Sequence, residues 1–270
     1  MLPAMVWVLG ASLDGVEQIH QYMAAAMIVN FLLSIPSVMA HWKKKAIWPN
    51  VVKPLAAGGL LGVIIGVQIS LLFSGEQARY LRYALGVFFI YVAYDNIRKA
   101  LAPKPTDGAT REMVEAQPAA KKFGIGSIVG VFAGITGLGG GVLAVPGQQL
   151  FLKVPIRNAI ANSSALIVAI AWLGAIMKNA QLGNQGNIER SLLLTACLAP
   201  TAMIGSYIGG HLTHNLPIKA IRIAFGLAIL LSTFKMFEPP KPASAYAPAA
   251  SQPASMVIST FGTGYAQLRP

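Results

Sequence analysis

Long apolar segments alternate with short polar ones along most of this chain. Segments of about 20 apolar residues occupy positions 22–40, 54–73, 82–100, 156–178, 191–212 and 218–237, and another begins at 123. Each is close to the roughly 20 residues that an α-helix needs to cross a bilayer. The pattern therefore predicts an all-α, polytopic membrane protein with a helix at every apolar segment.

One apolar segment, residues 123–152, contains the run Gly137-Leu138-Gly139-Gly140-Gly141 and then Pro146. Consecutive glycines carry a high entropic cost in a helix, so the helix is predicted to break here. A break at membrane depth exposes backbone groups that lipid cannot satisfy, and it persists only against protein or beside a polar cavity. We interpret 137–146 as a broken or re-entrant helix and a candidate binding site. Alternatively, the glycines only let helices cross closely.

The composition agrees with a membrane protein. Of the 270 residues, 55% are hydrophobic and 11% are charged, whereas soluble domains carry about 25% charged residues. The net charge of +12 comes from Lys and Arg that lie mostly between the apolar segments, as the positive-inside rule describes, and this placement argues against nucleic acid as a partner. Cys197 is the only cysteine, so neither an intrachain disulfide nor a cysteine metal site is expected.

The two halves of the chain share landmarks at a nearly constant offset. Gly62-xxx-Gly66 and Gly205-xxx-Gly209 are 143 residues apart, as are Pro3 and Pro146, and Arg82-xxx-Gly86 and Arg222-xxx-Gly226 are 140 apart. Such a repetition predicts two repeated helical units of about four helices each. Duplicated transporters commonly bind their substrate near the midplane, where the repeats meet.

The predicted organisation has four parts. They are a first membrane repeat at 1–101, a hydrophilic cytoplasmic linker at 102–122, a second membrane repeat at 123–237 and a disordered Pro/Ala-rich tail at 238–270. The first repeat is incomplete, because the counterpart of Gly139–Gly141 would precede Met1. Either a further segment lies upstream or one hairpin has been lost, and we favour the upstream segment.

Several of these features together resemble a known family. Apolar sequence runs into Gly137, Gly139–Gly141 and Pro146, and after a short basic loop comes Asn158-Ala159-Ile160-Ala161-Asn162-Ser163-Ser164. This arrangement, with a second copy upstream, resembles the sulfite exporter TauE/SafE family over most of residues 1–237. The resemblance implies a multi-pass transporter of the cell inner membrane that carries sulfite or a related organosulfur anion.

The candidate substrate-binding residues follow from the chemistry of an oxyanion. A half-helix that begins near Gly141 presents unpaired N–H groups and a partial positive charge. Side-chain groups from the surroundings are expected to complete the site. The candidates are Gly139, Gly140, Gly141, Asn162, Ser163, Ser164, Thr136 and Gln148 or Gln149, with Arg157 at the mouth. Alternatively, Asn162 and Ser163 bond neighbouring helices, and Arg157 is an interfacial anchor.

The function predicted from these observations is secondary transport of a small anion. No catalytic motif or phosphate-binding loop is present, so we expect no enzymatic activity, no cofactor and no metal, and energy from an ion or substrate gradient. The expected partners are the lipid bilayer and a small anionic substrate; the coupling ion is unknown and a homo-oligomer is left open. The alternative is a non-transporting membrane scaffold. An intramembrane enzyme ranks third.

Overall fold

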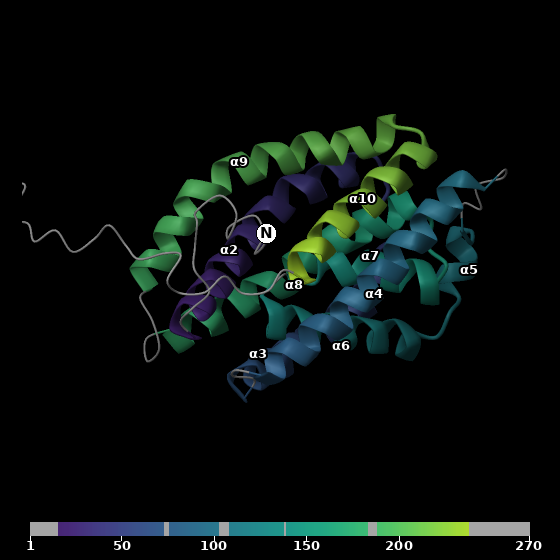
Figure 1. The fold of residues 1–270 in the computed structure, drawn as a ribbon. Helices are drawn as coiled ribbons and strands as arrows, with labels where there is room; N and C mark the ends of the chain where they lie inside the picture. The colour runs from purple at the N-terminus through teal and green to yellow at the C-terminus, as the bar shows by residue number, and fades with distance from the viewer. Residues whose placement is uncertain (1–15, 73–75, 103–107, 138, 183–187, 238–270) are drawn as a thin grey trace, which may run out of the picture. The chain divides into compact units, whose positions relative to one another are not determined.

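The structure is all-helical. The computed structural model describes residues 16–72, 76–102, 108–137, 139–182 and 188–237. Every regular element within these ranges is an α-helix (Figure 1). The helices are α2 (Val16–Lys43), α3 (Pro49–Leu72), α4 (Glu76–Leu101), α5 (Arg111–Glu115), α6 (Ala119–Thr136), α7 (Gly141–Phe151), α8 (Ile156–Leu182), α9 (Ile188–Asn215) and α10 (Ile218–Phe237).

Five described helices are long and apolar enough to cross a membrane. The spans are Gln21–Lys43, Pro49–Ser70, Ala119–Thr136, Ile156–Leu182 and Ser191–Asn215. Each of them matches an apolar segment of the sequence, and the prediction of an all-α polytopic membrane protein is confirmed.

The segment predicted as a hydrophilic linker, 102–122, contains helical structure. The short helix α5 lies within it, and α6 begins inside it at Ala119. The Lys122 side chain is buried, and its Nζ donates a hydrogen bond to the Glu115 carbonyl oxygen at 2.8 Å. The division into repeats, linker and tail remains a prediction, and residues 1–15 and 238–270 lie outside the described part of the chain.

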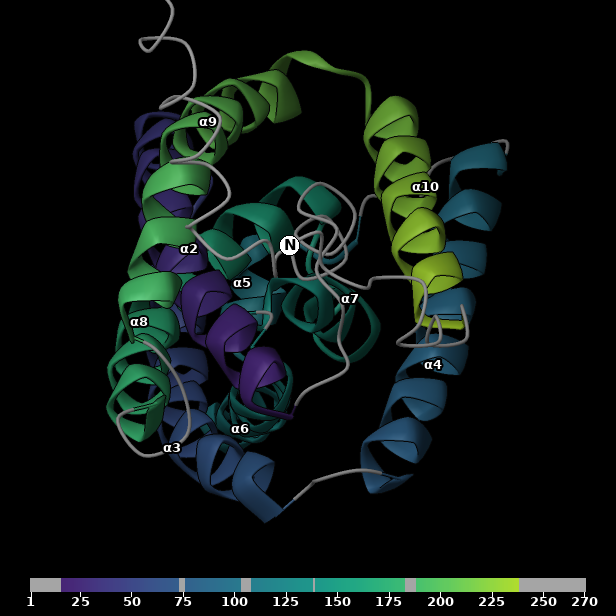
Figure 2. The same cartoon turned by 60° about the vertical axis from the view of Figure 1, so that its left-hand side comes forward.

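Helices from the two halves of the sequence pack against each other. Helix α2 packs along both α8 and α9, α3 packs along α6 and α8, and α4 packs along α10. Figure 2 shows α4 and α10 on one side, α2, α8 and α9 on the other, and α7 between them. The short helix α7 therefore lies among elements of both halves.

Two apolar clusters hold α7 in place. The larger one joins α2, α3, α6 and α8 to α7, with Met27, Leu55 and Leu166 fully buried beside Ala144. The other joins α4 and α10, and Leu143 of α7 packs against both clusters. In a membrane, van der Waals packing of such side chains holds helices together, so the position of α7 is fixed from two sides.

Glycines allow the close pairing of α3 and α6. A Cβ atom added at Gly58, Gly62 or Gly66 of α3 would clash with a carbonyl oxygen of α6. Glycines of α6 face α3 in the same way; they are Gly126, Gly130 and Gly134. By contrast, a Cβ atom at Gly205 or Gly209 of α9 would meet no described atom of another element within 4 Å. Glycines four residues apart thus form a close contact between helices in α3, whereas in α9 they face no described neighbour.

Candidate functional site

The chain leaves the α-helical conformation between Thr136 and Gly141. Gly137, Gly139 and Gly140 have φ angles of 70°, 67° and 74°. This left-handed region is readily available to glycine and strained for other residues. We call residues 137–140 the glycine turn; Pro146, by contrast, lies within α7.

After the glycine turn, α7 runs back alongside α6. The Cβ position at Gly140 lies 2.9 Å from a methyl carbon of Val129, and that at Gly147 lies 3.5 Å from Cγ2 of Ile125, one turn earlier in α6. The break in the helix is therefore a reversal of direction. Whether this hairpin enters the membrane from one side, as a re-entrant helix does, stays a prediction.

The turn packs tightly against neighbouring helices. A Cβ atom at Gly137 would lie 2.8 Å from Cβ of Met23 on α2, and one at Gly141 would lie 2.7 Å from Cδ1 of Ile167 on α8. These contacts fit the alternative interpretation, in which the glycines permit close packing. The two interpretations are compatible. Glycine lets neighbouring side chains approach the backbone closely, and it lets a ligand do the same.

Hydrogen-bond donors gather at the start of α7. The N–H groups of Leu143 and Ala144 donate to the Gly140 carbonyl oxygen at 3.1 Å and 2.9 Å. Those of Gly141 and Val142 come before the first acceptor that the helix itself supplies. Asn30 of α2 lies directly beside the turn, and its Nδ2 is 3.0 Å from the Cβ position at Gly139. Asn30 is 8% exposed, and this Nδ2 is buried without a partner in the described part of the chain.

The structure brings together Gln148 and Ser163. Gln148 is fully buried on α7, and its Nε2 donates to Oγ of Ser163 at 2.9 Å, whereas its Oε1 has no partner among the described residues. Gln149 is also buried, at 9% exposed. Seven residues of helix, about 10 Å, separate Gln148 from Gly141, so this pair does not share one small site with the glycine turn.

Asn162 and Ser164 bond to other elements. Asn162 Oδ1 accepts a hydrogen bond from the Trp48 backbone N–H at 2.8 Å, which ties α8 to the loop between α2 and α3. Ser164 Oγ lies 2.9 Å from Oγ of Ser37 on α2. These contacts, like that of Ser163, fit the alternative interpretation of bonds to neighbouring helices. The Nδ2 of Asn162 is buried without a partner in the described structure.

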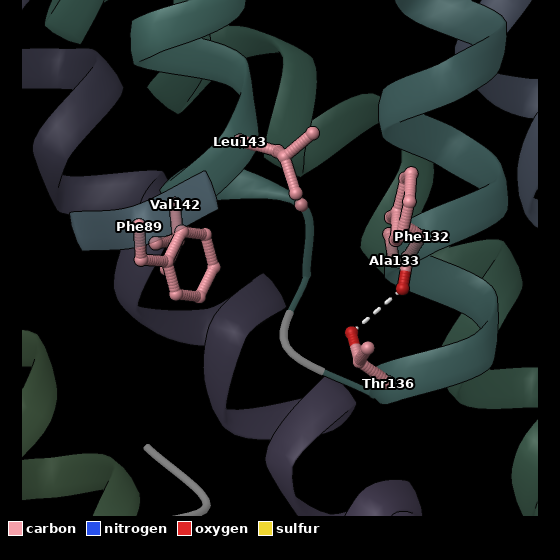
Figure 3. Close-up of a pocket in the computed structure, with 7 residues that line it drawn as sticks. Phe89, Phe132, Ala133, Thr136, Val142 and Leu143 are labelled. Atoms are coloured by element: carbon pink, nitrogen blue, oxygen red, sulfur yellow. Dashed lines mark hydrogen bonds between the residues drawn. The ribbon is translucent and has the colours of Figure 1, made fainter. Parts of the chain in front are cut away.

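Thr136 and Gly140 line a small cavity of about 10 Å³. Its other lining residues are Phe89, Phe132, Ala133, Val142 and Leu143 (Figure 3). The Thr136 hydroxyl donates to the Phe132 carbonyl oxygen at 2.6 Å, shown as a dashed line in Figure 3. A volume of this size holds about one water molecule, and its apolar lining offers an anion little to bind.

Arg157 lies at the start of α8 and bonds to the chain itself. Its Nη2 donates to the carbonyl oxygen of Leu216, in the connection between α9 and α10. This contact ties α8 to the connection between α9 and α10. The role of Arg157 at the mouth of the site or as an anchor at the membrane interface stays a prediction. No group of three or more His, Cys, Asp or Glu that would suit a metal ion occurs among the described residues.

Sequence reasoning missed two buried polar residues, Asn30 and Lys178. Asn30 interrupts an otherwise apolar stretch of the 22–40 segment, and an isolated amide in such a segment is a signal that could have been followed. Lys178 marks the end of a predicted span, but its side chain is only 2% exposed. The sequence does not reveal which way either side chain points, because that depends on the packing of α2, α3 and α8.

The fold and the glycine turn define a polytopic α-helical membrane protein with an interrupted helix. The chain belongs to the sulfite exporter TauE/SafE family, whose sequence model matches residues 1–236. No solved structure matches the chain significantly.

Curated relatives carry names of membrane transporters. The probable membrane transporter protein MamO of Magnetospirillum gryphiswaldense is 26% identical over 239 residues, which cover 77% of this chain and 37% of that protein. MamO of Paramagnetospirillum magneticum is 26% identical over 215 residues, 68% of this chain and 33% of that one. The chain thus spans about a third of the length of these two relatives. The probable membrane transporter protein YjnA of Bacillus subtilis is 26% identical over 218 residues, 78% and 82% of the two chains.

Proposed function

We propose that this chain is a secondary transporter of a small anion, sulfite or a related organosulfur anion, in the cell inner membrane. Membership of the TauE/SafE family and the transporter names of the relatives support membrane transport. Nothing in these names points to an enzymatic activity. The choice of sulfite or a related anion follows the name of the family, and the binding site is our own inference from the glycine turn.

The observation that carries this proposal is the pairing of Asn30 with the start of α7. The first turn of α7 supplies N–H donors and a partial positive charge. Asn30 adds a side-chain amide that is buried, unpartnered in the described structure and packed against Gly139. Leaving such a donor unpaired costs about 1–3 kcal/mol. An oxyanion at the turn would remove this cost by accepting from both groups.

We place the other predicted residues along the path of the anion and not at its binding site. Thr136 faces the small cavity beside Gly140, while Gln148, Asn162, Ser163 and Ser164 lie toward the first turns of α8. We assign them to the path that the anion follows past α7. Because the cavity holds about one water, passage of an anion requires α7 to move relative to its neighbours.

Flux through reconstituted protein tests the proposal. Purified chain in proteoliposomes should accumulate labelled sulfite down an imposed gradient, and Asn30→Leu should reduce this flux strongly. The leucine is apolar, and its side chain has the same number of heavy atoms and the same branch at Cγ as asparagine, so the variant should fold. The control is Lys44→Ala, at an exposed position after α2, which should leave flux unchanged. Equal flux in wild type and Asn30→Leu would show that the anion does not use the turn.

The alternative function is a non-transporting membrane scaffold. One face of α9 favours this candidate, because a Cβ atom added at Gly205 or Gly209 would meet no described atom of another element within 4 Å. Small residues on such faces mediate helix association in membranes. No flux for any sulfur anion, together with stable recovery of a membrane partner through α9, would support the scaffold.

A further inference from the structure

Lys178 is a buried cation in the interior of the helix bundle. It lies on α8 within the apolar span Ile156–Leu182, and its side chain is 2% exposed. Its Nζ donates a hydrogen bond to Oγ of Ser70 on α3 at 2.7 Å and lies 3.8 Å from the Met23 sulfur on α2. Three helices therefore converge on one ammonium group.

This ammonium has no ion-pair partner in the part of the chain whose side chains the structure describes. The ion pairs there are Lys99–Asp95 and Arg111–Glu115, and neither involves Lys178. Removing an ion from water costs several kcal/mol after relaxation, and one hydroxyl and a thioether recover only part of it. Ionisable residues inside membrane segments mark ion or substrate pathways for this reason.

One methionine separates Lys178 from the glycine turn. The Met23 sulfur faces the ammonium, and Cα and Cβ of the same residue lie 2.9 Å and 2.8 Å from the Cβ position at Gly137. Methionine is unbranched and flexible, so its thioether can change rotamer without displacing α2. Asn30 lies about two turns further along α2, beside Gly139. The ammonium and the unpartnered amide thus lie near opposite ends of the glycine turn.

We propose that Lys178 supplies the positive charge that holds the transported anion at the glycine turn, a step that rests on the proposed function. The Lys178 amine exchanges its bond with Ser70 for one with the anion when the Met23 side chain moves aside. An ammonium is a compact point charge without the planar geometry of a guanidinium. The site therefore selects small oxyanions by charge and size, and it accepts pyramidal sulfite and tetrahedral sulfonates alike.

A purely structural role for Lys178 and a role in anion binding predict different effects of its removal on the stability of the protein. If the lysine only joins α8 to α3 through Ser70, its removal loses a hydrogen bond and lowers the melting temperature. If its function is to meet an anion, an apolar side chain of similar length suits the empty site at least as well, because buried charges are often replaced without loss of stability. Lys178→Met separates these outcomes.

The experiment compares wild type, Lys178→Met, Lys178→Arg and Ser70→Ala in proteoliposomes, with sulfite as the probe. The matched control is Lys122→Met, which removes another buried lysine, one that bonds to the Glu115 carbonyl oxygen. We measure KM and maximal rate for sulfite uptake, and the melting temperature with and without sulfite.

Lys178→Met should raise KM for sulfite roughly ten- to hundredfold, the fold-change that corresponds to a lost charge-assisted hydrogen bond. It should abolish the rise in melting temperature caused by sulfite, while the protein without sulfite melts no lower than wild type. Lys178→Arg should restore part of the affinity. Ser70→Ala leaves the charge in place and removes the hydrogen bond that competes with the anion, so its KM should be equal to or lower than the wild-type value. Lys122→Met should keep the wild-type KM.

An unchanged KM in Lys178→Met would overturn this inference and leave the proposed function intact. The same holds if Ser70→Ala impairs stability and uptake as much as Lys178→Met does, because the hydrogen bond would then be the important feature. Wild-type protein that neither transports sulfite nor gains thermal stability from it would refute the proposed function and this inference together.

Discussion

Asn30 and Gly139 lie in direct contact, although more than a hundred residues separate them in the sequence. The Cβ position at Gly139 is 2.9 Å from Cγ and 3.0 Å from Nδ2 of Asn30. A side chain at residue 139 would therefore displace the amide that we assign to the anion. This contact joins the α2 helix of the first half to the turn in the second.

Replacing Gly139 with alanine should destabilise the protein. The left-handed backbone at φ 67° costs an alanine about 1–2 kcal/mol, and the added methyl group crowds Asn30. The matched control is Gly124→Ala on α6, where a Cβ atom meets no described atom of another element within 4 Å. This variant should be more stable than wild type by about 0.5–1 kcal/mol. Thermal melting in detergent measures both. Equal effects at the two positions would contradict the geometry of the turn.

The two glycine faces with the same sequence pattern should respond differently to a large side chain. Gly62→Leu should prevent correct folding, because a Cβ atom there clashes with the Ser127 carbonyl oxygen of α6. Gly205→Leu, at the matching position of α9, should change stability by no more than about 0.5 kcal/mol. Expression level and gel-filtration profile compare the variants. A misfolded Gly205→Leu protein would indicate that α9 has a partner on this face.

Asn162 is expected to fasten the loop between α2 and α3. Asn162→Leu leaves the Trp48 N–H without its side-chain acceptor, and an unsatisfied buried donor costs about 1–3 kcal/mol. Chemical or thermal unfolding should detect this loss. Normal stability combined with impaired sulfite uptake would instead identify Asn162 as a ligand of the anion.

Glu115, on the short helix α5 outside the candidate membrane spans, provides a test of surface electrostatics. A hydrogen bond from Asn50, together with one from Arg111, lowers the pKa of its carboxyl group below the ordinary 4.5. Since the folded state favours the charged form, the associated stability is present above the ordinary pKa and is lost as pH falls through the lowered value. Asn50→Ala should raise this pKa, which carboxyl NMR titration can follow; an unchanged pKa would assign the shift to Arg111 alone.

The helices could be predicted because their signal is local. The segment expected at 54–73 corresponds to α3, Pro49–Leu72, and that at 218–237 to α10, Ile218–Phe237. Length and apolar character determine such spans, since each helix satisfies its own backbone. The start of α6 at Ala119 was less visible, because charged residues such as Lys121 and Lys122 precede its apolar part.

The candidate site could be predicted only in part, because its side chains depend on tertiary packing. The glycine run marks where the chain turns, and the turn at 137–140 follows from the backbone freedom of glycine. Asn30 and Lys178 join the site through the packing of α2, α3 and α8. Asn162, a candidate from the sequence, bonds to Trp48, a partner that no sequence pattern indicates.

The most direct measurement is NMR of the glycine-turn amides with and without sulfite. Protein labelled with ¹⁵N-glycine in nanodiscs gives signals from its 27 glycines, which single substitutions to alanine can assign. Sulfite should shift the amide signals of Gly139, Gly140 and Gly141 with a saturable dependence on concentration, and leave Gly205 and Gly209 unchanged. Saturable shifts elsewhere in the chain, with the amide signals of Gly139, Gly140 and Gly141 unmoved, would contradict the account.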